Sequence, residues 1–177
     1  KQRLSDSSTN FAQGGIAGVL DRNDGDALEA HVKDTLEAGG GIGNEKIIRM
    51  VVEEAAVRIQ DLIDEGVNFH KNDSGNYDLA MEGGHNERRI LHAKDATGAE
   101  IERALITACL NEQRVTIYED CLALDLILDD RTSNDRKVVG LWCLKSDSTV
   151  FTLPSRAVVL ATGGAGQLWR QTTNPSV

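Results

Sequence analysis

A run of mostly small and polar residues lies near the start of the chain. Residues 8–15 read Ser-Thr-Asn-Phe-Ala-Gln-Gly-Gly. Hydroxyl and amide side chains can form hydrogen bonds, and Gly14 and Gly15 allow the backbone to lie close to a flat or anionic molecule. A plain glycine turn before a strand is the alternative, and the residue types alone leave it open.

A second glycine cluster follows an apolar run near the end of the chain. Residues 158–166 read Val-Val-Leu-Ala-Thr-Gly-Gly-Ala-Gly. Open α/β sheets bind ligands outside the carboxyl ends of such strands. A structural glycine turn is the alternative here too. Neither residues 39–44 nor the segment from Gly164 completes the dinucleotide pattern G-x-G-x-x-G.

Charged residues crowd a third segment, which starts at Glu82-Gly83-Gly84-His85. Two arginines, a histidine and an aspartate follow within ten residues, at Arg88, Arg89, His92 and Asp95. Such groups can bind a dicarboxylate or a phosphate, but a solvated loop with weak ion pairs is the alternative. We predict no metal site, because the histidines are seven apart and lack a cysteine partner. No Gly-x-Ser-x-Gly indicates a nucleophilic serine.

Hydrophobic periodicity predicts the elements that hold these segments. Helices are expected over residues 27–38, between a cap at Asn44 and a stop at Gly66, and from a capping box formed by Thr97 and Glu100. Strands are expected at residues 67–69, 77–79, 115–119, 122–128, 138–144 and 157–161. The sequence therefore predicts an α/β fold with a β-meander set into it.

Composition limits the class of protein. A chain of 177 residues suits one domain, and its net charge of −9 argues against nucleic-acid or anionic-membrane partners. No apolar run reaches the roughly 18 residues of a membrane helix. Three cysteines without a Cys-x-x-Cys favour a reduced compartment, and we predict a cytoplasmic location. The chain starts at Lys1 without a methionine, so we expect the natural start to lie elsewhere.

Four separated motifs together resemble the L-aspartate oxidases of the succinate dehydrogenase and fumarate reductase flavoprotein superfamily. They are STNFAQGGIA from Ser8, EGGHNERRILHAKDATG from Glu82, VVLATGGAG from Val158 and TTNP from Thr172. The resemblance implies that residues 1–177 are an incomplete, Rossmann-like FAD-binding domain. The first βα unit and the capping domain of the family would lie outside it.

The resemblance also assigns roles to residues. Glu82 would face the amino group of the substrate as the catalytic residue. The FAD-binding residues would be Lys1, Ser8, Thr9, Asn10, Phe11, Ala12, Gln13, Gly14, Gly15, Leu122, Ala123, Ala161, Thr162, Gly163 and Gly164. Succinate dehydrogenases carry a covalently flavinylated histidine where this chain has Ser8, so FAD is expected to be bound non-covalently.

The implied reaction is the oxidation of L-aspartate to iminoaspartate, with electrons passed to oxygen or fumarate. It is the first step of NAD synthesis from aspartate, and quinolinate synthase is the expected recipient of the product. Two alternatives remain: a soluble fumarate reductase or succinate dehydrogenase-type flavoprotein, and a non-catalytic fragment. The aromatic residue that such relatives typically carry before Gly-Gly is replaced here by Glu82, which favours the oxidase.

Overall fold

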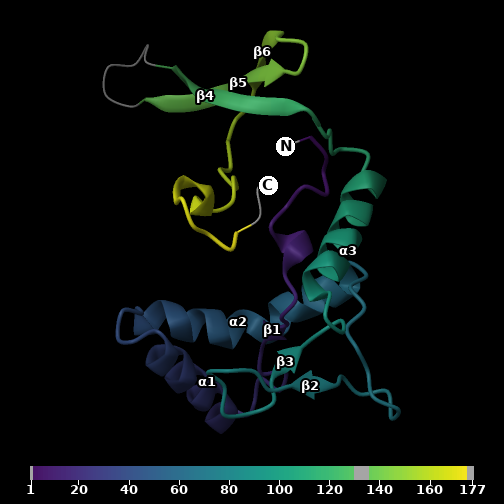
Figure 1. Cartoon of the computed structure of the whole chain (residues 1–177), viewed down its shortest axis with the longest axis vertical. Helices are drawn as coiled ribbons and strands as arrows, with labels where there is room; N and C mark the ends of the chain where they lie inside the picture. Colours follow the sequence, from purple (N-terminus) through teal and green to yellow (C-terminus); the bar gives the residue numbers. More distant parts are fainter. Residues whose placement is uncertain (1, 130–135, 175–177) are drawn as a thin grey trace. The chain divides into compact units, whose positions relative to one another are not determined.

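The chain forms two compact units in a computed structural model that describes residues 2–129 and 136–174. One unit is Thr9–Glu112, and the other combines Lys1–Ser8 with Gln113–Val177. The first unit holds the helices α1–α3 and a small sheet, and the second holds a separate three-stranded sheet (Figure 1).

The three helices predicted from the hydrophobic periodicity are confirmed in the first unit. They are α1 (Gly25–Ala38), α2 (Glu45–Asp64) and α3 (Thr97–Asn111). Asp24 caps α1 by accepting from the N–H of Ala27, and Asn44 caps α2 as predicted by accepting from Lys46 and Ile47. Gly66 follows α2 with φ +94°, a conformation that favours glycine. None of the described helices is long and apolar enough to cross a membrane.

The predicted capping box at α3 is wrong. The N-cap is Ala96, and no side chain caps the helix. Thr97 is the first helical residue, 1% exposed, and its hydroxyl accepts from the N–H of Ala93. Glu100 accepts instead from the backbone N–H of Asn68, 2.8 Å away. Both side chains therefore connect α3 to neighbouring segments, a role that local sequence spacing does not reveal.

The first unit also contains a small antiparallel sheet. Its strands run in the order β1 (Ile16–Ala17), β3 (Ile90–Leu91) and β2 (Leu79–Ala80), with Leu91 opposite both Ile16 and Leu79. The strand predicted at residues 77–79 is displaced to β2, and residues 67–69 form no strand. Instead, Val67 and Phe69 enter the core cluster, which also contains Ile59, Leu91 and Ala104.

The second unit contains the predicted β-meander. Its antiparallel strands are β4 (Cys121–Asp129), β5 (Lys137–Lys145) and β6 (Val150–Pro154), in that order across the sheet. The strands predicted at residues 122–128 and 138–144 are confirmed, whereas β6 was not predicted. A register shift between Ala123 and Asp125 marks an irregularity in β4.

Two predicted strands are wrong. Residues 115–119 and 157–161 form no strand in the structure. Their β-branched residues favour extended backbone, but a strand also needs hydrogen bonds from a neighbour, and no described strand pairs with either segment. Val159 and Leu160 are consequently 88% and 70% exposed. Helices and sheets still combine as the predicted fold class requires.

The glycine at position 98 permits close packing of α3 against residues 9–12. A Cβ there would overlap the carbonyl oxygen of Thr9 and the side chain of Ala12. Gly98→Ala is therefore expected to lower the free energy of unfolding by about 1–3 kcal/mol, measurable by urea denaturation. The matched control is Gly25→Ala at the start of α1, where a Cβ meets nothing within 4 Å. Equal effects of the two substitutions would contradict the packing argument.

Candidate functional site

Residues 9–15 lie on the N-terminus of α3. Thr9–Phe11 form the short 3-10 helix η1, and the N–H of Ala12 donates to the carbonyl of Thr9 over 3.0 Å. The N–H of Gly98 donates to the carbonyl of Ala12 over 2.9 Å. The segment is thus held by its backbone on one side, while residues 9–14 remain exposed on the other.

The two glycines of this segment, Gly14 and Gly15, differ in what surrounds them. A Cβ on Gly15 would overlap the carbonyl oxygen of Leu91 and the side chain of Ile90, so β3 requires a glycine there. A Cβ on Gly14 would have only the Glu82 carboxylate nearby, 3.5 Å from Oε2. Packing within the protein therefore explains Gly15, whereas Gly14 lies on the open side of the segment.

Glu82 lies in an exposed turn that follows β2. The N–H of His85 donates to the carbonyl of Glu82 over 3.2 Å, and Gly84 has φ +85°. The Glu82 carboxylate faces Gly14. The structure therefore brings the predicted substrate-facing residue next to the predicted cofactor-binding segment, although 68 positions separate them in the chain.

A buried ion pair fixes the far side of this turn. Arg89 donates to Asp34 of α1 over 2.7 Å, and both side chains are only 3% exposed. Asn86 donates to the same carboxylate from its backbone N–H, over 3.0 Å, and from its side-chain amide, over 2.6 Å. Sequence reasoning singled out Arg89 but missed Asp34. The available signal was a carboxylate one turn from His31 on the inward side of a helix.

This pairing determines the charges of the cluster. The N–H of Asn86, assisted by the Arg89 guanidinium and the Asn86 amide, lowers the pKa of Asp34 to about 2 against the opposing effect of burial. Burial, followed by the charge of Arg89, lowers the pKa of His31. His31 packs against His85 with ring centroids 5.5 Å apart, so at neutral pH it is a buried, uncharged packing residue.

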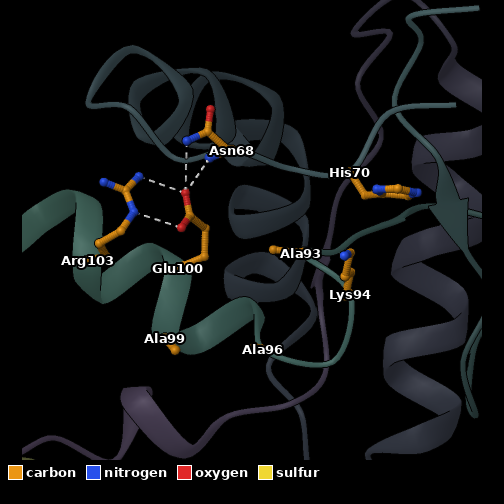
Figure 2. Close-up of a pocket in the computed structure, with 8 residues that line it drawn as sticks. All are labelled: Asn68, His70, Ala93, Lys94, Ala96, Ala99, Glu100 and Arg103. Carbon is orange, nitrogen blue, oxygen red and sulfur yellow. Dashed lines mark hydrogen bonds and ion pairs between the residues drawn. The ribbon is translucent and has the colours of Figure 1, made fainter. Parts of the chain in front are cut away.

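A pocket of about 430 Å³ lies elsewhere in the same unit (Figure 2). It is lined by Asn68, His70, Ala93, Lys94, Ala96, Ala99, Glu100 and Arg103. Glu100 accepts from Asn68 and Arg103, and Arg103 also donates to the carbonyl of Gly66 over 2.7 Å. These charged groups already have partners, and none of the lining residues was predicted to bind cofactor. The network joins the segment that follows α2 to α3.

The second unit contains the other predicted cofactor-binding residues. The N–H of Asp120 donates to the carbonyl of Gln2 over 3.3 Å, which places the chain start beside β4. A pocket of about 370 Å³ is lined there by Gln2, Leu122, residues 144–146 and Ser148, among others. Leu122 is 58% exposed, and Ala123 follows it in β4. Lys1 lies outside the described residues.

Residues 161–164 and Ser8 also belong to the second unit. All five are exposed, and residues 161–164 have no regular secondary structure. Gly163 has φ +81°, and a Cβ on Gly163 or Gly164 would meet nothing within 4 Å. These glycines therefore present open backbone rather than a packed turn.

Family comparison identifies the class of protein. The profile of the FAD-binding domain family matches residues 1–177, so the chain belongs to this family, and FAD is its cofactor. The chain is 44% identical over 180 residues to an L-aspartate oxidase of Vibrio cholerae, covering 98% of this chain and 33% of that protein. The L-aspartate oxidase of Yersinia pestis is 40% identical, with 100% and 34% covered. The chain thus spans about a third of these relatives.

Solved structures support the fold. A variant of the quinol fumarate reductase of E. coli superposes with a TM-score of 0.83 at 27% identity, covering 97% of this chain and 28% of that chain. The described residues fit a flavin cofactor at two places. The open side of residues 9–14 and the bare backbone of Gly163 and Gly164 both allow close approach of a planar, anionic molecule.

The depressed pKa of Asp34 makes stability depend on pH. Its ordinary value is 3.8 and its folded value about 2, so the stabilisation is complete above the ordinary value and is lost as the pH falls towards 2. Asp34→Asn should therefore destabilise the protein at pH 7, with a Tm roughly 10 °C lower. The difference from the parent should shrink between pH 4 and pH 2. Thermal unfolding at several pH values tests this.

The control is Glu37→Gln, which removes an exposed carboxylate of the same helix. This substitution should change Tm little at any pH. A difference between Asp34→Asn and the parent that stays constant down to pH 2 would contradict the assigned role of Asp34.

Proposed function

We propose that the chain is part of an FAD-dependent L-aspartate oxidase that converts L-aspartate to iminoaspartate and passes the electrons to oxygen or fumarate. The observation that carries the proposal is the position of the Glu82 carboxylate against Gly14, beside the exposed cofactor-binding segment. The similarity to L-aspartate oxidases along the whole chain supports it. Residues 1–177 would then be part of one FAD-binding domain.

Glu82 offers a binding partner for the amino group that distinguishes an amino dicarboxylate from a plain dicarboxylate. Aspartate differs from succinate by an ammonium group, and a carboxylate is its simplest partner. Loss of hydride from the α-carbon produces an imine, so the amine must be neutral as the transfer begins. Glu82 holds the arriving ammonium and accepts its proton, directly or through water. The flavin ring of FAD would accept the hydride.

The remaining predicted residues are proposed to bind FAD. Residues 8–15 would contact the pyrophosphate and the isoalloxazine, and Lys1 would lie near the adenosine. Leu122 and Ala123 would meet the adenine through their backbone, and residues 161–164 would line the cofactor. The pocket shared by Gln2 and Leu122 supports the adenosine assignment. Because Ser8 offers no imidazole, FAD binding is non-covalent.

Two alternatives have distinct tests. A soluble fumarate reductase or succinate dehydrogenase-type flavoprotein is favoured by the similarity to the E. coli enzyme, but Glu82 beside Gly14 favours an amino substrate. Reduction of bound FAD by aspartate but not by succinate would separate the two. The other alternative is a non-catalytic fragment. An intact mass near the 19.2 kDa of this chain would support that alternative.

We also propose a partner and a location. Iminoaspartate is unstable in water, so direct transfer to quinolinate synthase would protect it. The three cysteines are free, which supports a reduced, cytoplasmic compartment.

Non-covalent binding predicts that the flavin is released on denaturation. Trichloroacetic acid precipitation of the complete protein should leave the yellow colour in the supernatant, because Ser8 cannot form the histidyl–flavin bond. Absorbance of both fractions measures this. Flavin that remains with the washed pellet would exclude the proposed mode of binding.

Glu82→Gln tests the proposed role in substrate choice. In the complete enzyme, it should lower kcat/KM for aspartate by about 10- to 1000-fold, because the neutral amide cannot balance an ammonium. Reduction of fumarate, which has no amino group, should change far less. Steady-state kinetics with both substrates, on one preparation with known FAD occupancy, measures the difference.

Glu54→Gln is the matched control, because it removes an exposed carboxylate from α2 without touching the turn. It should leave both reactions unchanged. If Glu82→Gln reduced both reactions equally, Glu82 would support the fold or the flavin and would not be the amine partner.

A further inference from the structure

We propose that Asp34 is a positioning residue that fixes Glu82 through Asn86 and thereby sets the preference for amino dicarboxylates. This inference rests on the proposed function of Glu82. Asp34 is contributed by α1, lies outside every segment predicted to bind substrate or cofactor, and has no direct contact with Glu82 among the described interactions.

The link begins in the turn itself. The hydrogen bond from the N–H of His85 to the carbonyl of Glu82 closes the turn, and Asn86 is the next residue. Asn86 directs two donors, its backbone N–H and its side-chain amide, to the two oxygens of the Asp34 carboxylate. Two bonds in different directions restrict rotation of the peptide as well as its distance from α1. The exit of the turn is therefore anchored, whereas the Glu82 side chain is exposed.

The anchor is itself held rigidly. Asp34 is buried and paired with Arg89, whose backbone N–H donates to Ala80 over 3.2 Å and whose carbonyl accepts from Gly18 over 2.8 Å. The backbone of Arg89 is therefore bonded both to the end of β2 and to the residue that follows β1. Ala80 also ends β2, just before the turn. The entrance of the Glu82 turn is therefore linked to Arg89 through the backbone, and its exit is linked to the same residue through the ion pair with Asp34.

The expected consequence is selective. Aspartate and fumarate both carry two carboxylates, but only aspartate carries the amine that Glu82 meets. Loosening the turn displaces Glu82 and weakens the amine contact, while leaving the groups that hold carboxylates unaffected. A displacement of about 1 Å can lower a rate on the order of 100-fold. Loss of the anchor should therefore change the ratio of the two activities rather than both together.

The test uses two variants of the complete, FAD-loaded enzyme. Asn86→Ala removes one of the two bonds and preserves the ion pair, and Asp34→Asn removes the charge on which both depend. We expect roughly a tenfold loss of kcat/KM for aspartate in Asn86→Ala and a larger loss in Asp34→Asn. Fumarate reduction should stay within about twofold of the parent in Asn86→Ala. Hydrogen–deuterium exchange of a peptide spanning residues 81–86 should be faster in both variants.

Glu29→Gln is the matched control, because Glu29 also connects α1 to another element, through Arg49 of α2, but does not contact the turn. It should leave the activity ratio and the exchange of residues 81–86 unchanged. Glu82→Gln, measured alongside, separates the two hypotheses. If Glu82→Gln does not change the activity ratio, the proposed function fails.

If Glu82→Gln changes the ratio but Asn86→Ala does not, positioning by Asp34 is excluded while the proposed function stands. Faster exchange in Asn86→Ala with an unchanged ratio would also overturn it, because the turn would then be loosened without effect. Should Asp34→Asn fail to fold, Asn86→Ala decides, since Asn86 is exposed and the ion pair remains.

Discussion

The buried pair of Asp34 and Arg89 is the interaction on which the candidate site depends. Removing a carboxylate from water is unfavourable unless an opposite charge and further hydrogen bonds satisfy its oxygens. Here Asn86 supplies two further donors to the carboxylate. The hydrogen bonds that stabilise the buried carboxylate also hold the Glu82 turn against α1. Burial of Asp34 therefore fixes the position of the turn.

Close backbone packing supplies the second constraint on the site. Residues 9–15 lie between α3 and β3, and at both contacts a side chain would collide with a carbonyl oxygen. Gly98 meets Thr9, and Gly15 meets Leu91. Because glycine is needed at these two points, the segment keeps one face on the protein and leaves Gly14 facing Glu82. Glycines that suggest ligand contact in the sequence can thus serve internal packing.

In the second unit, the candidate residues differ in how firmly their backbone is held. Leu122 and Ala123 lie on a regular strand whose pairing with β5 fixes their backbone, and the chain start lies beside them through Asp120 and Gln2. Residues 161–164, in contrast, are exposed and unpaired by any described strand. The apolar run that precedes them has strand-forming residues but no described partner, so sequence propensity alone does not make it a strand.

Local patterns in the sequence determined the three helices, two strands of the meander and the candidate segments. Periodicity and caps such as Asn44 act over a few residues, and four separated motifs were enough to indicate the flavoprotein class. The tertiary structure decided the rest. Thr97 and Glu100 have the spacing of a capping box, yet they bind Ala93 and Asn68. The role of Asp34 depends on partners 52 and 55 residues away, and sequence spacing carries no information about which distant groups a buried charge will meet.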